Sequence, residues 1–418
     1  MIITKKINIL IILFYFSLLL GFFLDEDSIG GAFNDYEGHA HIAEKFKSNF
    51  LYTLLNYNDL GHRHSPIFYI VKSIFLNFGE LGQRILFLHL FLLIPIIFYN
   101  CLKIIFINTS KNKLKSISLL IVLFPTFRAY AIWPDPHLLG TLFFVISIYF
   151  YLKFKKNINI FHNALYHTFF LSLSAYCSPN FGLFIIFFFL AFYNKFNFSK
   201  NLFAIFLLNI LLSLPFFYYL FFLEVNFIFN NNGWDIGHNF YNINNITNKI
   251  IIVISIFLFY LLPFFLSGKI KYNFKYFSKN KINLIVHTLI FFVVCYFFDF
   301  SYAYSLTNSG GGFFYNLSNL IFKNNVLLFV VSFFGYLFLI EIFRLDKNNL
   351  ILFIALILSN PQITIWQANF SPTMFFLVLL LFNLKLKREL FNLNTIYINY
   401  FYFSLYLIIS IGAKTLLN

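Results

Sequence analysis

The sequence predicts an all-α polytopic membrane protein with about 13 transmembrane helices. Its composition is the first reason: 60% of the residues are hydrophobic and 11% are charged, whereas soluble domains carry about 25% charged residues. The mean hydropathy is +0.78. The second reason is that apolar runs of about 17 residues or more recur along the chain, and each could cross a hydrocarbon layer of about 30 Å as a helix. We therefore expect residues 1–418 to form one integral-membrane domain.

The apolar segments predict the helices in chain order. The first, residues 7–24, is interpreted as a retained span because no small-residue cleavage site precedes the acidic residues that follow it. Residues 36–47 can form a short amphipathic helix. Residues 66–80 are apolar, but Lys72 interrupts them and they are too short to span, so we expect an interfacial helix that Pro66 opens on the outer leaflet. Further spans are expected at 82–105, 116–132, 138–152, 160–177, 181–194, 202–223, 250–267, 282–299, 326–343, 349–360, 372–384 and 395–413.

The basic residues orient these helices. With the N-terminus in the cytoplasm, 21 of the 30 lysines and arginines fall at cytoplasmic ends and loops, as the positive-inside rule requires. Twelve of the 15 carboxylates lie on or near the outer side, and the C-terminus is external. The net charge of +15 then reflects membrane topology, and no nucleic-acid partner is expected. Cys101, Cys177 and Cys295 fall within spans, where we expect them to act as packing residues.

The segment 25–66 concentrates reactive side chains directly behind the first span. It holds seven of the 15 carboxylates and four of the ten histidines. The triplet DED at its start is expected to be a solvated exit of the first helix. On the short helix that follows, Asp35 and His39 are expected to share a face at i, i+4, as are Glu37 and His41. A solvated polar loop with capping residues is the alternative.

Three later segments are polar enough to be considered. The turn WPDPH holds Asp135 and His137, for which capping of the next span is as good an interpretation as function. The loop NNNGWDIGHNFYN holds Asp235 and His238 in otherwise ordinary loop chemistry. Residues 305–319 contain three glycines without the strand and helix of a nucleotide-binding fingerprint. We expect them to form a flexible external loop, either a lid or a hinge.

The segment 25–66, with the residues that directly follow it, resembles part of a known superfamily. An acidic pair, a short helix ending IAEKF and then HSPIFYI are similar to the first external loop of the GT-C membrane glycosyltransferases. In that superfamily an Asp/Glu pair and a helix precede a His/Lys-Pro-Pro-aromatic interfacial helix. The resemblance implies that residues 25–81 form an external catalytic loop and that Asp35 is the catalytic carboxylate. Because the usual adjacent acids are here Asp-Tyr-Glu, Glu37 stays open as the alternative. His64 falls on the His-Pro-Pro element, and Asp135 falls on the second acidic position.

The overall layout is similar to the α-1,2-glucosyltransferases of lipid-linked oligosaccharide synthesis. That family has an Asn near the outer end of the fifth span, which corresponds to Asn180 in YCSPNFG. Its GD-x-x-x-H element corresponds to the segment with Asp235 and His238, and a late Pro-Gln pair corresponds to Pro361-Gln362. The chain departs from the family in two places, because the Arg before that Asn and the Arg of the late Arg-Tyr motif are missing.

The resemblance implies sugar transfer from a polyprenyl-phosphate donor to a glycan, lipid or protein acceptor at the outer (periplasmic or lumenal) membrane face. Such transfer needs a base for the acceptor hydroxyl and cations or strong donors for the departing phosphate. Asp35 is the expected base, with inversion at the sugar, and Glu37 or Asp135 would orient the acceptor. The expected donor-phosphate residues are Arg63, His64, Lys72 and Arg128; the expected substrate-binding residues are His39, His41, His62, His137, Asn180, Asp235 and His238. A solubilising charge at Arg63, and snorkelling of Lys72 and Arg128 to the headgroups, are the alternatives.

No cofactor is expected. The motifs HAH and HRH each place two imidazoles at i, i+2, which do not face each other on a helix. On an extended stretch they could hold Zn or Mn together with Asp35 or Glu37, but the resemblance argues against a metal. The expected partners are the donor, a glycan or lipid-linked acceptor and membrane lipids. The expected location is the bacterial cytoplasmic membrane, or the ER membrane in a eukaryote.

Two other classes of function stay open. A membrane transporter or a lipid or glycan flippase would be expected to show internal repeats, and ionisable residues or broken helices at mid-membrane. The sequence has no fixed-period repeat, and most of its charges lie at the surfaces. A glycan polymerase or ligase would be expected to carry basic external loops, whereas the external loops here are acidic.

Overall fold

Helices make up the regular structure of this chain. A computed structural model describes residues 2–60, 64–225, 243–267, 275–301, 310–360, 364–384 and 391–417. Within these ranges no strand forms, and a single isolated bridge joins Gly310 and Trp366. The predicted all-α class is therefore confirmed for the part of the chain that is described. The contacts group the helices into two compact units, Met1–Trp234 and Asp235–Asn418, which are treated separately below.

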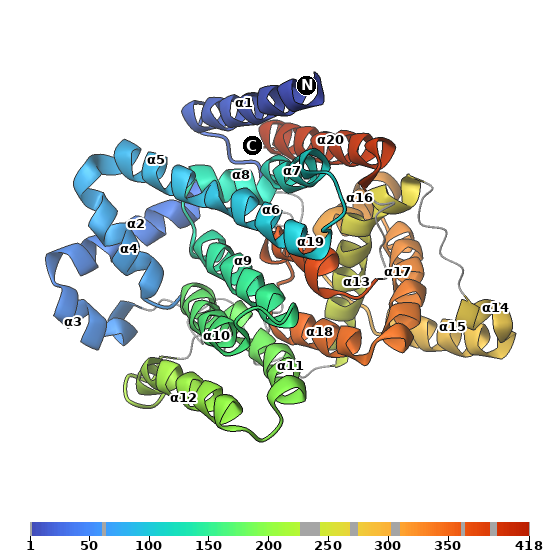
Figure 1. Ribbon diagram of the computed structural model, residues 1–418. Helices are drawn as coiled ribbons and strands as arrows, with labels where there is room; N and C mark the ends of the chain where they lie inside the picture. Colours follow the sequence, from blue (N-terminus) through green and yellow to red (C-terminus); the bar gives the residue numbers. More distant parts are fainter. Residues whose placement is uncertain are drawn as a thin grey trace. The chain divides into compact units, whose positions relative to one another are not determined.

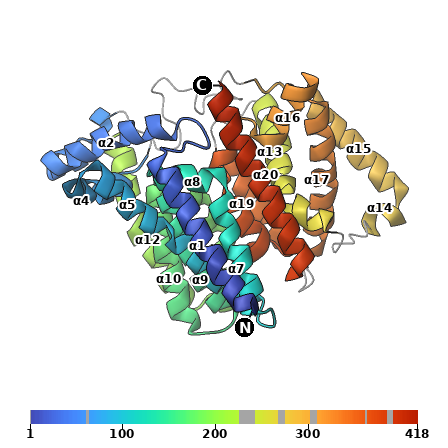
Figure 2. The ribbon, with the colours of Figure 1, turned by 90° about the horizontal axis from the view of Figure 1, so that it is seen from above.

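The first unit contains the polar segments that the sequence analysis singled out. Its α-helices are α1 (Ile2–Phe23), α2 (Ala32–Ser48), α3 (Phe50–Leu55), α4 (Ile67–Phe75), α5 (Gly79–Phe91), α6 (Leu93–Ile105), α7 (Lys111–Leu119), α8 (Pro125–Ile132), α9 (Pro136–Lys155), α10 (Ile160–Cys177), α11 (Ile185–Phe196) and α12 (Lys200–Phe221). Short 3-10 turns η1 (Tyr57–Leu60), η2 (Leu76–Phe78), η3 (Leu120–Leu123) and η4 (Pro179–Phe184) connect some of them. Figures 1 and 2 show α1 running beside α7 and α8, with α2 packed against α4.

The second unit is built around α13 (Ile243–Leu266), which packs against α16, α17 and α20. Its other elements are α14 (Lys275–Lys279), α15 (Lys281–Tyr296), α16 (Gly312–Phe322), α17 (Val326–Leu345), α18 (Lys347–Leu358), η5 (Gln367–Asn369), α19 (Thr373–Phe376), the π-helical turn η6 (Leu377–Leu381) and α20 (Leu393–Leu417).

Several of these helices are long and apolar enough to cross a membrane. In the described ranges there are seven such segments, or eight if the bent pair α7–α8 is one span. They are Ile67–Ile105, Pro136–Lys155, Pro179–Phe196, Lys200–Phe221, Asn245–Leu266, Val326–Leu345 and Leu393–Lys414. The chain is thus a multi-pass helical membrane protein. The predicted number of 13 spans is not confirmed; among the described residues, the apolar helices Lys281–Tyr296 and Lys347–Leu358 are shorter than a span.

Two predicted spans differ from the expectation, one because it bends and one because its helical part is short. The segment predicted at 116–132 bends by 67° between η3 and α8, where Pro125 begins the new helix. Proline has no N–H to continue the preceding hydrogen-bond ladder, so a break at this residue is expected physically. In the segment predicted at 372–384, the four-residue α19 continues directly into the π-helical turn η6, so the helical part ends at Leu381. In contrast, the predicted interfacial helix at 66–80 continues into the next span as one apolar helical segment, Ile67–Ile105.

The predicted flexible loop at 305–319 is wrong over its second half. Helix α16 begins at Gly312, and the glycine before it, Gly311, caps it with a φ of 75°. A positive φ is readily available to glycine and rare for other residues. The Gly311 N–H also donates to the Ile365 carbonyl oxygen at 2.7 Å. The glycines therefore start and anchor a helix.

The centre of the first unit is α9, whose side chains are mostly buried. Gly140 lets α10 and η4 approach it closely: a Cβ there would lie 3.0 Å from the Phe181 ring and 3.2 Å from the Ser174 carbonyl oxygen. Small residues allow such close approach between membrane helices. The Ser174 hydroxyl also donates to the Gly140 carbonyl oxygen at 2.7 Å. This packing fixes the N-terminal end of α9, where Asp135 lies.

Candidate functional site

The helix predicted at 36–47 is present as α2, Ala32–Ser48. The Asp27 carboxylate accepts hydrogen bonds from the backbone N–H groups of Gly30 and Gly31 at 2.9 and 2.8 Å, and so holds the chain just before the helix. Tyr36 and His39 lie on its buried face, whereas Asp35, Glu37 and His41 are exposed. Asp35 and His39 therefore do not share an environment, although they are one turn apart.

The buried face of α2 is tied to α4 and α5 through Tyr36. The Tyr36 hydroxyl donates to Gln83 Oε1 at 2.9 Å. Burial raises the pKa of the Tyr36 phenol, so it stays a protonated donor. The Lys72 ammonium donates to the Tyr36 carbonyl oxygen at 3.1 Å and lies 3.6 Å from the centre of the ring. Lys72 is fully buried. Its charge is therefore directed at α2, and the contact with a donor phosphate stays a prediction.

His39 joins the two polar segments that the sequence predicts to form the site. Its Nε2 lies 3.4 Å from Asp135 Oδ2, and its Nδ1 lies 3.1 Å from the Tyr69 hydroxyl. The His64 ring packs edge-on against it, with centroids 5.6 Å apart. His39 and Asp135 are 4% and 6% exposed. Because both ring nitrogens have partners, His39 is suited to hold α2 in place.

Asp135 adopts the capping geometry that the sequence analysis left open. It is the N-cap of α9, and its Oδ1 accepts a hydrogen bond from the His137 N–H at 2.7 Å. With Oδ2 next to His39, both carboxylate oxygens are engaged. The His137 ring stacks on Phe181 with centroids 5.4 Å apart, and its Nδ1 lies 3.4 Å from the Ser178 hydroxyl. Asn180 follows in η4, where it is half-buried.

The DED triplet was expected to be solvated, which holds for Asp25, whose side chain is 64% exposed, but not for Glu26, whose side chain is 10% exposed. Asp25 Oδ1 lies 2.8 Å from an Arg84 guanidinium nitrogen. Glu26 forms a two-pronged pair with Arg128, at 2.7 Å to Nε and 2.5 Å to Nη2. Arg128 also donates to the hydroxyl and carbonyl oxygens of Ser17. The Arg128 side chain is 4% exposed, so its fork is occupied by a carboxylate of the protein, and its expected phosphate role stays a prediction.

Some expected site residues cannot be placed. His62 and Arg63 lie outside the described residues, as do Asp235, His238 and the Pro361-Gln362 pair. His64 is half-buried, and its carbonyl oxygen accepts a hydrogen bond from the Tyr57 hydroxyl.

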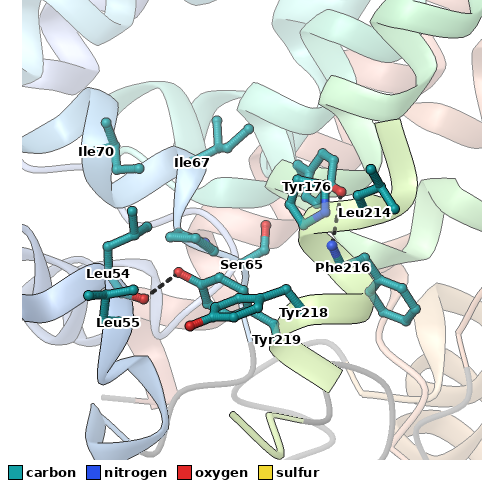
Figure 3. A pocket seen from close by; sticks show the side chains of 12 residues that line it. Leu54, Leu55, Ser65, Ile67, Ile70, Tyr176, Leu214, Phe216, Tyr218 and Tyr219 are labelled. Carbon is teal, nitrogen blue, oxygen red and sulfur yellow. Dashed lines mark hydrogen bonds between the residues drawn. The ribbon is translucent and has the colours of Figure 1, made fainter. Parts of the chain in front are cut away.

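An apolar pocket of about 490 Å³ opens beside the start of α4. Figure 3 shows Leu54, Leu55, Ile67 and Ile70 on one side and Tyr176, Leu214 and Phe216 on the other. Hydrogen bonds fix its walls, from the Tyr219 hydroxyl to the Leu54 carbonyl oxygen and from the Phe216 N–H to the Tyr176 hydroxyl. Ser65, 3% exposed, lines the pocket, and its hydroxyl has no partner among the described residues. Such a pocket suits an aliphatic or isoprenoid chain.

Four residues of this site were not predicted from the sequence: Tyr36, Tyr69, Gln83 and Arg84. The only local signal was the Gln83-Arg84 pair at the start of an apolar segment, because polar residues within hydrocarbon are costly unless they have partners. In the described part of the chain, no three His, Cys, Asp or Glu side chains are grouped to hold a metal ion. Comparisons with known protein families, curated proteins and solved structures find no match to this chain.

Proposed function

We propose that the chain is a membrane glycosyltransferase of the GT-C type that uses a polyprenyl-phosphate sugar, with Asp35 as general base. The supporting observation is the anchoring of α2. Its buried face is held by the His39–Asp135 contact and by the Tyr36–Gln83 hydrogen bond. Asp35 is exposed one turn before His39. An exposed carboxylate on an immobilised helix is an arrangement that suits base catalysis.

The reaction is a single displacement at the anomeric carbon. Asp35 takes the proton of the acceptor hydroxyl, and the acceptor oxygen forms a bond to the anomeric carbon. The bond between that carbon and the phosphate oxygen breaks, and the polyprenyl phosphate leaves with the electron pair. Attack opposite to the leaving group inverts the sugar. Glu37, also exposed on α2, is the alternative base.

The apolar pocket supports a lipid-linked donor. It adjoins Ser65, which directly follows the expected phosphate residues Arg63 and His64. A donor lying there would place its isoprenoid chain against α3, α4, α10 and α12, with its phosphate at the segment before α4. In this proposal the N-terminus is cytoplasmic, and α2 and α4 lie at the periplasmic or lumenal face.

The test compares three variants of the full chain in membrane vesicles supplied with radiolabelled polyprenyl-phosphate sugars. Asp35→Asn is expected to lower the transfer rate about 10²- to 10⁴-fold. Glu37→Gln is expected to retain most of the rate. Glu44→Gln, which neutralises another exposed carboxylate of α2, is the matched control. Normal transfer by Asp35→Asn together with loss in Glu37→Gln would assign the base to Glu37. Normal transfer by both Asp35→Asn and Glu37→Gln would show that neither residue is the general base.

One observation favours a second candidate, a transporter or lipid flippase. The segment predicted as a span at 116–132 bends by 67° where Pro125 begins α8, and discontinuous helices are typical of transporter binding sites. Sealed vesicles distinguish the two functions. A transporter would move the labelled polyprenyl-phosphate sugar across the membrane without transferring the sugar to any acceptor.

A further inference from the structure

We infer that Arg84 is a positioning residue of the site. It clamps the turn that carries Asp135 and, through Asp135 and His39, sets the position of α2. This inference rests on the proposed function and extends it to a residue in α5 that meets none of the reacting groups.

The contacts of Arg84 converge on the end of α8. Its Nε donates to the Ile132 carbonyl oxygen at 3.1 Å, and its guanidinium carbon lies 3.6 Å from the centre of the Trp133 ring. Ile132 is the last residue of α8. The last carbonyl groups of a helix have no partner within the helix, and a cation there also matches the helix dipole. Arg84 therefore closes the C-terminal end of α8 by hydrogen bonding and by charge.

The other contacts of Arg84 are weaker anchors. Asp25 and Glu80 lie 2.8 and 3.8 Å from its guanidinium nitrogens, and both carboxylates are 64% exposed. Exposed ion pairs contribute little because water screens them. The Phe22 ring lies 4.8 Å away on α1. The buried contacts with Ile132 and Trp133 are therefore those that hold the guanidinium in place.

The turn from α8 to α9 is short and is held at both ends. Only Trp133, Pro134 and Asp135 separate the two helices. Arg84 holds the beginning of the turn, and Asp135 holds its end by capping α9 and contacting His39.

In the middle of the same turn, the Trp133 ring packs on α2. It contacts Phe33 and Tyr36, with centroid distances of 4.8 and 5.6 Å. A shift of the Ile132 carbonyl would thus reach α2 both through the Trp133 ring and through Asp135. Because Asp35 lies on the same helix, its distance from a bound acceptor depends on this clamp.

A misplacement of about 1 Å can cost about 100-fold in rate. Arg84→Gln is therefore expected to lower kcat about 10- to 100-fold and to leave the donor KM within about twofold of wild type. That split is the mark of a positioning role, since the Arg84 side chain is 8% exposed and is held by Ile132 and Trp133. The fold-loss in kcat of the double variant Arg84→Gln, Asp135→Asn is expected to be smaller than the product of the two single fold-losses, because both residues act through one turn.

Trp133 offers a readout that does not depend on activity. The chain has three tryptophans, so a Trp234→Phe, Trp366→Phe background leaves Trp133 as the only one. Trp133 is 4% exposed, and acrylamide should quench it weakly. In Arg84→Gln the quenching constant is expected to rise. Glu80→Gln, which removes only an exposed partner of Arg84, is the control and is expected to change neither quenching nor kcat.

Unchanged quenching in a folded Arg84→Gln variant would overturn the clamp. A rise in quenching with normal kcat would overturn the positioning role, and so would a rise in donor KM with normal kcat. Arg84→Lys keeps the charge and removes the planar fork. If Arg84→Gln does not fold, the quenching and kcat of Arg84→Lys decide whether Arg84 positions the turn. If wild type transfers no sugar from any donor, the proposed function fails, while the quenching still decides whether Arg84 clamps the turn.

Discussion

Arg128 and Glu26 should form the ion pair on which the first unit most depends. Arg128→Met removes a guanidinium that donates to both Glu26 oxygens and to Ser17. The Glu26 side chain is 10% exposed, so its carboxylate would be left nearly buried without a cation. Removing one partner of a buried pair costs about 3–5 kcal/mol, and we expect Arg128→Met to destabilise the first unit by that amount.

Neutralising Glu26 in place of Arg128 should lower the free energy of unfolding by less. Glu26→Gln keeps an oxygen that can accept from Arg128, and the guanidinium keeps its contacts with Ser17. The loss is then about 1.5–3 kcal/mol, the range for hydrogen bonds to charged groups. In the double variant Arg128→Met, Glu26→Gln, neither charge of the pair remains. Its loss in free energy of unfolding should therefore be about 0.5–3 kcal/mol smaller than the sum of the two single losses.

Thermal unfolding in detergent, followed with a thiol-reactive dye, measures these differences. Cys101 and Cys177 are fully buried and would react only when the first unit opens. A Cys295→Ser background removes the partly exposed thiol. Asp25→Asn is the control, because Asp25 is largely exposed and its pair with Arg84 should be worth less than about 1 kcal/mol. An Arg128→Met midpoint no lower than that of Asp25→Asn would refute the assignment of Arg128 to a structural pair.

Two further changes test the packing of the first unit and its pocket. Gly140→Val places new atoms within about 3 Å of the Phe181 ring and the Ser174 carbonyl. We expect this overpacking to lower the free energy of unfolding by about 1–3 kcal/mol, measured in the same unfolding assay. The same substitution at the open position Gly38 is the control and should show no such loss. Ile70→Trp fills the apolar pocket. The KM for a long polyprenyl donor should then rise several-fold, whereas the KM for a short, water-soluble donor should not change. An equal rise in KM for both donors would show that the lipid chain binds elsewhere.

The helices of this chain were predictable because hydrophobic length is a local property. Each of the predicted apolar segments contains helix in the structure, and α2 was expected at 36–47 and is found at Ala32–Ser48. The number of membrane spans was harder to predict from the sequence. Pro125 breaks one apolar run into two helices, and the sequence alone does not show whether such a bent pair spans the membrane or turns back.

The partners of the charged residues were not predictable from local pattern. Glu26 and Arg128 are about 100 positions apart, as are His39 and Asp135. A triplet such as DED therefore looks the same to a local analysis whether water or a distant arginine covers it. The shared face expected for Asp35 and His39 failed for a geometric reason. At about 100° per residue, positions i and i+4 differ by about 40°, and the edge of the buried face runs between them.

The carboxylates of the site differ in how far they are buried. Both Asp135 oxygens are engaged, one by the α9 N–H of His137 and one by His39. Proton uptake by Asp135 would weaken the cap and the contact with α2 at the moment of transfer. Asp35 and Glu37 are exposed on a helix that other residues hold in place. This difference in burial is the reason that we propose a base on α2, with Asp135 in a supporting role.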